Sequence, residues 1–131
     1  MFATTRKYYA VDTGLINVYP PSVSNFSKQL ENIVFLKLKK DQKTLSFGAL
    51  PSGKEIDFIA QAKDGSIEKY QVTQTLHDDN YEREMSSFLM TDTKLESGDN
   101  ILLTLDGDER EIQYRNVKAA KRNIPVWLLG L

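Results

Sequence analysis

The first strong pattern in the chain is a run of apolar residues at helical spacing between Ser24 and Lys40. These residues recur every three or four positions, which is typical of a helix with one buried face. They are Phe26, Leu30, Ile33, Val34 and Leu38. On a helical wheel that starts at Leu30, Glu31 falls between Leu38 and Phe35, so its carboxylate lies inside the apolar arc. Lysines close the segment, where cations favour the negative end of the helix dipole.

Alternating patterns then predict strands. Residues 44–49 read as a short strand, and residues 54–61 alternate with Ile56, Phe58 and Ala60 on one face and Asp57 on the other. Asp64 and Gly65 form the strongest hairpin signal, because both tolerate positive φ. A two-residue turn there would place Asp57 opposite Val72, whereas a bulge or a longer loop would bring Asp57 beside Gln71.

The return strand, residues 66–75, places Tyr70 and Val72 on one face and Lys69, Gln71 and Thr73 on the other. A second helix begins near Asp78 and carries an apolar stripe of Tyr81, Met85, Phe88 and Leu89. Residues 101–105 predict a buried strand, and residues 111–115 predict a further one. The apolar segment 124–131 should pack against the body of the domain. This order of elements favours an α/β fold in which helices flank a mixed sheet.

Composition narrows the class of protein. With 131 residues, 40% of them apolar, the chain suits one domain, which we expect over residues 22–131 after an extended lead-in at 1–21. There is no cysteine and only one histidine, which excludes disulfides, thiolate chemistry and a histidine-rich metal site. The apolar runs are too short to span a membrane, and residues 1–7 do not read as a secretory signal. We therefore expect a cytoplasmic protein.

One motif resembles a nucleotide-binding loop. Gly48, Gly53 and Lys54 match the first part of G-x-x-x-x-G-K-[ST], but Glu55 occupies the position where Ser or Thr must hold Mg²⁺. A true phosphate-binding loop also opens a helix, whereas residues 55–60 alternate like a strand. The sequence favours a turn between two strands.

A second group of polar residues is a candidate for a metal-dependent site. Asp57 and Gln71 lie on the two strands of the predicted hairpin, and we expect Glu31 to approach Asp57 where the first helix meets the sheet. Carboxylates from neighbouring elements, followed by a lysine on the third strand, form the metal-dependent centre of the PD-(D/E)XK nuclease core. Here the third strand carries Gln71 and Thr73 on its polar face.

Four blocks of sequence carry a family resemblance. They are Lys7–Leu15, Leu30–Phe35, Pro51–Ile59 and Tyr70–Thr73. Together they resemble the uncharacterised C-terminal domain of prokaryotic AAA-type ATPases, which has a restriction-endonuclease-like fold. The resemblance extends from about Arg6 to Trp127–Leu129.

The resemblance implies a site at Glu31, Asp57, Gln71 and Thr73, with Glu31 and Asp57 as the ligands of a possible Mg²⁺. The changes to an amide at Gln71 and a hydroxyl at Thr73 favour an accessory domain with a degenerate nuclease-like site, used for recognition of protein or nucleic acid. Its expected partners are an ATPase module, in the same polypeptide or separate, and DNA.

Two other functions stay open. One is a Mg²⁺-dependent nuclease with a rearranged site at Glu31, Glu55, Asp57 and Gln71, for which only Lys54 or Lys69 could supply the cation. The other is an oligomerisation module, such as a homodimer. Fold alone does not decide among these functions.

The altered phosphate-loop motif gives the first testable prediction. Because Glu55 replaces the Mg²⁺-binding hydroxyl, calorimetric titration of the protein with Mg-ATP should show no binding in the micromolar range. Binding at that affinity would contradict our interpretation of residues 48–55 as a turn and a strand.

Overall fold

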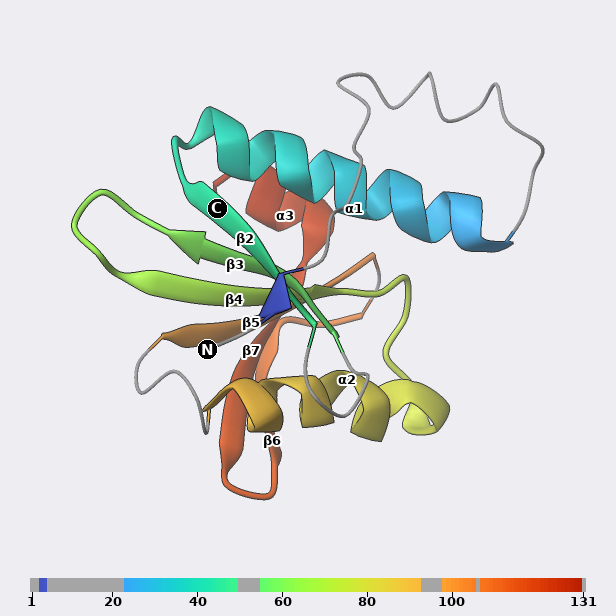
Figure 1. The fold of residues 1–131 in the computed structure, drawn as a ribbon. Coiled ribbons are helices and arrows are strands. Elements are labelled where there is room, and N and C mark those ends of the chain that lie inside the picture. The colour runs from blue at the N-terminus through green and yellow to red at the C-terminus, as the bar shows by residue number, and fades with distance from the viewer. Residues whose placement is uncertain (1–2, 5–22, 50–54, 93–97, 106, 131) are drawn as a thin grey trace.

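The computed structural model describes residues 3–4, 23–49, 55–92, 98–105 and 107–130 as one α/β domain (Figure 1). Its seven strands form a single mixed sheet in the order β1-β2-β3-β4-β5-β7-β6. The strands are β1 (Ala3–Thr4), β2 (Thr44–Ala49), β3 (Glu55–Gln61), β4 (Ile67–Val72), β5 (Asp99–Thr104), β6 (Arg110–Tyr114) and β7 (Val117–Asn123). The helices are α1 (Val23–Lys40), α2 (Asp78–Asp92) and α3 (Ile124–Leu128).

The direction of the strands changes at the centre of the sheet. Neighbours from β1 to β4 are antiparallel, β4, β5 and β7 are parallel, and β6 returns antiparallel along β7. Helix α2 makes the crossover from β4 to the parallel β5, as parallel neighbours require. The α/β class and the mixed sheet flanked by helices are therefore confirmed.

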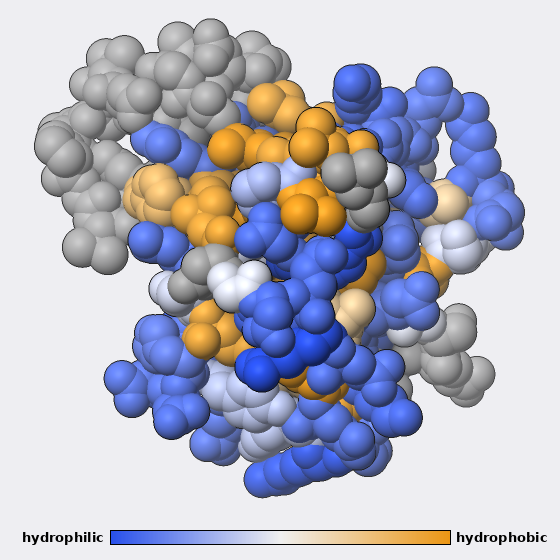
Figure 2. Space-filling model, turned by 180° about the vertical axis from the view of Figure 1, so that it is seen from behind, coloured by the Kyte–Doolittle hydropathy of each residue, from blue (hydrophilic) through white to orange (hydrophobic). Residues whose placement is uncertain are grey.

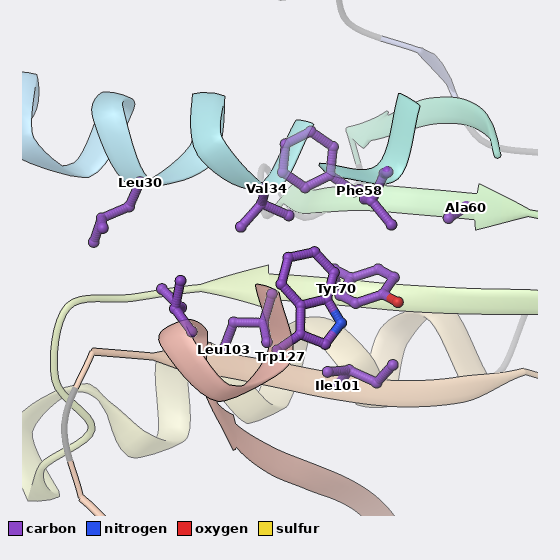
Figure 3. Packing of buried hydrophobic residues seen from close by; sticks show 10 residues of the cluster. Leu30, Val34, Phe58, Ala60, Tyr70, Ile101, Leu103 and Trp127 are labelled. Atoms are coloured by element: carbon purple, nitrogen blue, oxygen red, sulfur yellow. The ribbon is translucent and has the colours of Figure 1, made fainter. Parts of the chain in front are cut away.

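The first core lies between the sheet and the helices α1 and α3 (Figure 3). Val34 of α1 and Phe58 of β3 are fully buried there, and Trp127 of α3 lies against Tyr70 with ring centroids 5.7 Å apart. The prediction that the last segment packs against the domain is confirmed for α3. Burial raises the pKa of Tyr70, since the charged phenolate would lose its hydration.

The second core lies between the sheet and α2. The predicted apolar stripe of α2 is confirmed: Met85 and Phe88 are fully buried, and Tyr81 and Leu89 pack at the margin. The sheet contributes six buried residues to this cluster: Ile56, Ile59, Leu102, Ile112, Val117 and Ala119.

One sequence prediction about the strands is wrong, and one strand was missed. Ile56 packs against α2, on the opposite face from Phe58 and Ala60, because a register shift interrupts the alternation of β3. Strand β7 was not predicted at all. Of the residues expected in the lead-in, Ala3 and Thr4 form the edge strand β1, and residues 1–2 and 5–22 lie outside those described.

The far edge of the sheet is covered at β6. The Tyr81 hydroxyl donates to the backbone carbonyl of Gln113, and the Tyr114 hydroxyl donates to Glu82 Oε1 over 3.1 Å. The two tyrosine rings meet edge to face at 6.1 Å. Helix α2 is thereby attached to β6 as well as to the centre of the sheet.

Most of the surface visible from the opposite side is hydrophilic (Figure 2). Apolar residues gather in the upper half, the half that holds α1 and α3 in Figure 1. Among the described residues, the large hydrophobic side chains that stay exposed are Phe26 and Leu129. No helix in the described ranges is both long and apolar enough to cross a membrane.

The hairpin between β3 and β4 has a three-residue loop, the longer of the two alternatives that the sequence left open. The Ala62 amide donates to the Ser66 carbonyl, and Gly65 returns its amide to the Ala62 carbonyl. Gly65 has φ of 91°, the left-handed conformation that such loops place at their last residue. Asp64 accepts hydrogen bonds from the amide and hydroxyl of Ser66, which lower its pKa.

The conformation of Gly65 predicts the cost of adding a side chain. No atom lies within 4 Å of a Cβ built there, so Gly65→Ala should lose only the backbone term of about 1–2 kcal/mol. Gly98→Ala should cost more, because its Cβ would also lie 3.0 Å from the Ile67 carbonyl oxygen. Urea unfolding of both variants measures the difference, and equal losses would contradict it.

Candidate functional site

Side chains replace the backbone ladder where β3 and β4 separate. Regular pairing runs from Gln61↔Ile67 to Phe58↔Tyr70. Beyond it, the Asp57 amide donates to Gln71 Oε1 over 2.7 Å, and the Val72 amide donates to Asp57 Oδ2 over 2.9 Å. Each strand thus satisfies a backbone amide of the other with a side-chain oxygen. We call this region, formed by Asp57, Gln71 and Val72, the β3–β4 notch.

Two local irregularities bring Asp57 and Gln71 together. The three-residue loop shifts the register by one position relative to a two-residue turn, so that Asp57 comes opposite Gln71. On the side of β3 that pairs with β2, Ile59 lies opposite Ser46 and Ile56 lies opposite Gly48. Between these pairs β3 has one residue more than β2, which is a β-bulge. A bulge of this kind bends the strand and redirects its side chains, which explains the position of Asp57.

Strand β4 leaves β3 at the notch and follows β5 instead. The Thr73 amide donates to the Leu103 carbonyl, and the Leu105 amide donates to the Gln74 carbonyl, each over 3.0 Å. The parallel pairing therefore continues past the point where the antiparallel pairing stops. The notch lies at the carboxyl end of β4, where α/β sheets often bind ligands.

Helix α2 adds a carboxylate that the sequence analysis missed. Glu84 Oε2 accepts a hydrogen bond of 3.3 Å from Gln71 Nε2, and the side chain of Glu84 is 10% exposed. Burial raises the pKa of this carboxyl, the neighbouring Arg83 opposes the shift, and Glu31 adds to it. Glu31 of α1 is half-buried, and its negative charge is the smallest of the causes of this shift.

The remaining candidates take other positions. The Thr73 hydroxyl donates to the Thr75 carbonyl at 3.3 Å and lies 3.4 Å from Asn80 Nδ2, so it belongs to the loop that enters α2. Lys69 is fully buried on β4 opposite Ile59. Lys54 and the side chain of Glu55 lie outside the described part of the chain.

A signal for Glu84 was present but ambiguous. Asn80, Glu84 and Ser87 recur at helical spacing along α2, and all three are buried in the structure. A polar stripe on a helix usually faces solvent. Since the apolar stripe of α2 already accounted for one buried face, nothing in the sequence indicated that the polar stripe is buried as well. The stripe faces inward because it meets hydrogen-bonding groups, such as the Thr75 carbonyl that accepts from Asn80 over 2.7 Å.

The arrangement is better suited to holding the strands than to holding a metal. The oxygen of Gln71 and one oxygen of Asp57 already accept backbone hydrogen bonds. Within the described ranges, no group of three or more His, Cys, Asp and Glu side chains is placed to hold a metal ion. The sequence analysis named Glu31 and Asp57 as ligands of a possible Mg²⁺, whereas the carboxylate that the amide of Gln71 connects with Asp57 is that of Glu84.

The burial of Glu84 predicts a pH-dependent effect of Glu84→Gln. A carboxyl with a raised pKa in the folded state contributes most to stability at acidic pH, and this contribution is lost as the pH rises through the folded pKa. The glutamine side chain of the variant does not titrate, so the stability of the variant relative to the native protein should increase from pH 4 to pH 8. Urea unfolding across this range measures it, and a difference that falls with pH would contradict the assignment.

Comparisons with known proteins give little further information. Models of known protein families and solved structures give no match to the chain. Among curated proteins, an uncharacterised protein of Haemophilus influenzae is 42% identical over 62 residues, which is 47% of this chain and 15% of that protein. The matched segment is thus a small part of a much longer relative.

Proposed function

We propose that this chain is an accessory domain with a restriction-endonuclease-like fold and a degenerate PD-(D/E)XK site, and that it serves an AAA-type ATPase system in recognition of nucleic acid or protein. The observation that carries the degenerate site is the use of Gln71. Its amide bonds to β3 and to Glu84, at the position where the nuclease core needs a metal-binding carboxylate.

The third-strand cation is absent from the same place. Thr73 stands where the nuclease core has its lysine, and its hydroxyl is engaged by the loop before α2. Without a cation there, nothing at this position orients the attacking water or offsets the charge that develops on the phosphate. On this proposal the domain retains the nuclease-like fold but lacks two of its reactive groups, the carboxylate replaced by Gln71 and the lysine replaced by Thr73.

The order of elements supports the proposed fold. A helix, an antiparallel meander of β2, β3 and β4, a crossover helix and a parallel strand follow one another, and Asp57 and Gln71 occupy adjacent strands of the meander. The relative in Haemophilus influenzae is several times longer than this chain, which leaves room there for a further module. An upstream nucleotide-binding motif in the native reading frame would support the link to an ATPase.

The most direct test combines cleavage and binding. The protein should leave supercoiled plasmid intact with Mg²⁺ or Mn²⁺, and should bind duplex DNA in EDTA with an affinity that falls as salt rises. Cleavage by the native chain would overturn the degenerate site. If the protein binds neither duplex nor single-stranded DNA, recognition of DNA is excluded and recognition of a protein is what the proposal then states.

A second candidate, a Mg²⁺-dependent nuclease with a rearranged site, is favoured by one observation. Glu84 lies against Gln71 and brings a carboxylate from α2 to the region that lacks one on β4. The two carboxylates in question are then Asp57 and Glu84, which the amide of Gln71 connects. In this case Glu84→Ala should abolish a cleavage activity that the native protein shows with Mn²⁺.

Restoring the missing carboxylate tests the nuclease-derived interpretation that both candidate functions share. Gln71→Glu keeps an acceptor for the Asp57 amide and adds negative charge beside Glu84, so Mn²⁺ should bind about tenfold more tightly or better, since affinity follows the number of charged ligands. Thr73→Lys alone should not improve binding, because it adds like charge near the metal. Calorimetry or Mn²⁺ resonance measures the affinity, with cleavage of plasmid by the double variant as a second readout.

The exposed Gln61, also on β3, offers a matched control. Gln61→Glu adds the same charge away from the notch and should leave Mn²⁺ affinity unchanged. If Gln71→Glu binds the metal no better than the native chain, the nuclease-derived interpretation of this site fails and Asp57 is an ordinary strand acid.

A further inference from the structure

A single side chain connects helix α2 with the backbone of β3. Gln71 Nε2 donates to Glu84 of α2, and Gln71 Oε1 accepts the amide of Asp57 on β3. The side chain itself comes from β4, between the two elements that it joins, and is 5% exposed. Three consecutive elements of the chain, β3, β4 and α2, therefore meet at one amide group.

The two hydrogen bonds fix the amide in one orientation. An amide nitrogen only donates and an amide oxygen only accepts. With Nε2 directed at the Glu84 carboxylate, Oε1 faces the Asp57 amide. A flip of the group would set Nε2 against the donor of Asp57 and Oε1 against the carboxylate of Glu84, so both contacts would be lost together.

We propose that Glu84 is a positioning residue that holds the β3–β4 notch closed through Gln71, so that a displacement of α2 opens the two strands. The Glu84 carboxylate holds the amide, the amide holds the backbone of β3 at Asp57, and Asp57 in turn holds the Val72 amide of β4. This device is independent of the function proposed above, because it requires neither metal nor nucleic acid.

The position of α2 makes it suitable for this role. Its inner side packs on the sheet through Met85 and Phe88, while Asp79, Glu82 and Arg83 face solvent. A molecule that binds the exposed side of α2 and displaces the helix would thus also displace Glu84, which contacts Gln71 directly. The regular ladder from Phe58 to Gln61 does not depend on α2 in this way, since its bonds join backbone to backbone.

Amide hydrogen exchange by NMR tests the proposal on the intact chain. In Glu84→Leu, the Asp57 amide should exchange at least about tenfold faster and the Val72 amide should follow it, since the Gln71 amide loses the acceptor that orients it. The amides of Ala60 and Tyr70, which lie in the regular ladder, should keep their native rates. Asp79→Leu also replaces a carboxylate of α2 by leucine, at an exposed position, and should leave Asp57 unchanged.

Two further variants keep the result interpretable. Gln71→Met breaks the connection without altering Glu84 and should accelerate the same two amides, also in the event that Glu84→Leu does not fold. Glu84→Gln retains an acceptor oxygen and should preserve their protection. An unchanged Asp57 rate in the variant that folds, or an equal acceleration of all ladder amides, would overturn the proposal.

Discussion

The separation of β3 from β4 depends on one extra residue in β3. The bulge between Ile56 and Ile59 turns Asp57 toward β4, and the backbone donors of Asp57 and Val72 then lack a regular ladder partner. Unsatisfied buried donors are costly, so side chains must supply the acceptors. The oxygens of Gln71 and Asp57 do so, and this requirement explains why polar residues stand at these two positions of the sheet.

The same constraint explains the polar interior of α2. A buried amide at Gln71 has a donor that needs an acceptor, and Glu84 provides it at the cost of burying a carboxylate. Burial raises the pKa of Glu84 because the charged form loses hydration that one amide and Arg83 only partly replace. Helix α2 thus packs on the sheet through the apolar contacts of Met85 and Phe88 and through the hydrogen bonds that connect Glu84, by way of Gln71, with β3.

Periodicity predicted the elements whose apolar pattern is regular. The helices α1 and α2 and the strands from β2 to β6 follow from spacing alone, with ends that differ by a few residues. Strand β7 escaped prediction because only Val117 and Ala119 mark its buried face before Lys121, a residue type that is rarely buried. Lys121 is tolerated there because its ammonium donates to the Asp108 carbonyl over 2.8 Å, a contact between distant residues that no local pattern reveals.

The candidate site was predictable only in part for a related reason. The parity of β4 placed Gln71 on the correct face, but the face of Ile56 and the register of Asp57 depend on a bulge and on loop length, neither of which the alternation of residues specifies. Glu84 lies 13 residues from Gln71 in sequence and meets it only because α2 crosses back over the sheet.

The contact between Tyr81 and Gln113 has a consequence for how the molecule behaves in a crowded solution. An edge strand that offers free carbonyls and amides invites another chain to add a strand, which is a route to aggregation. The phenol occupies one outward carbonyl of β6, and Arg110 and Glu111 place charges along the same five-residue strand. Replacing Tyr81 would therefore do more than weaken the packing of α2: it would uncover a surface on which copies of the protein can join edge to edge.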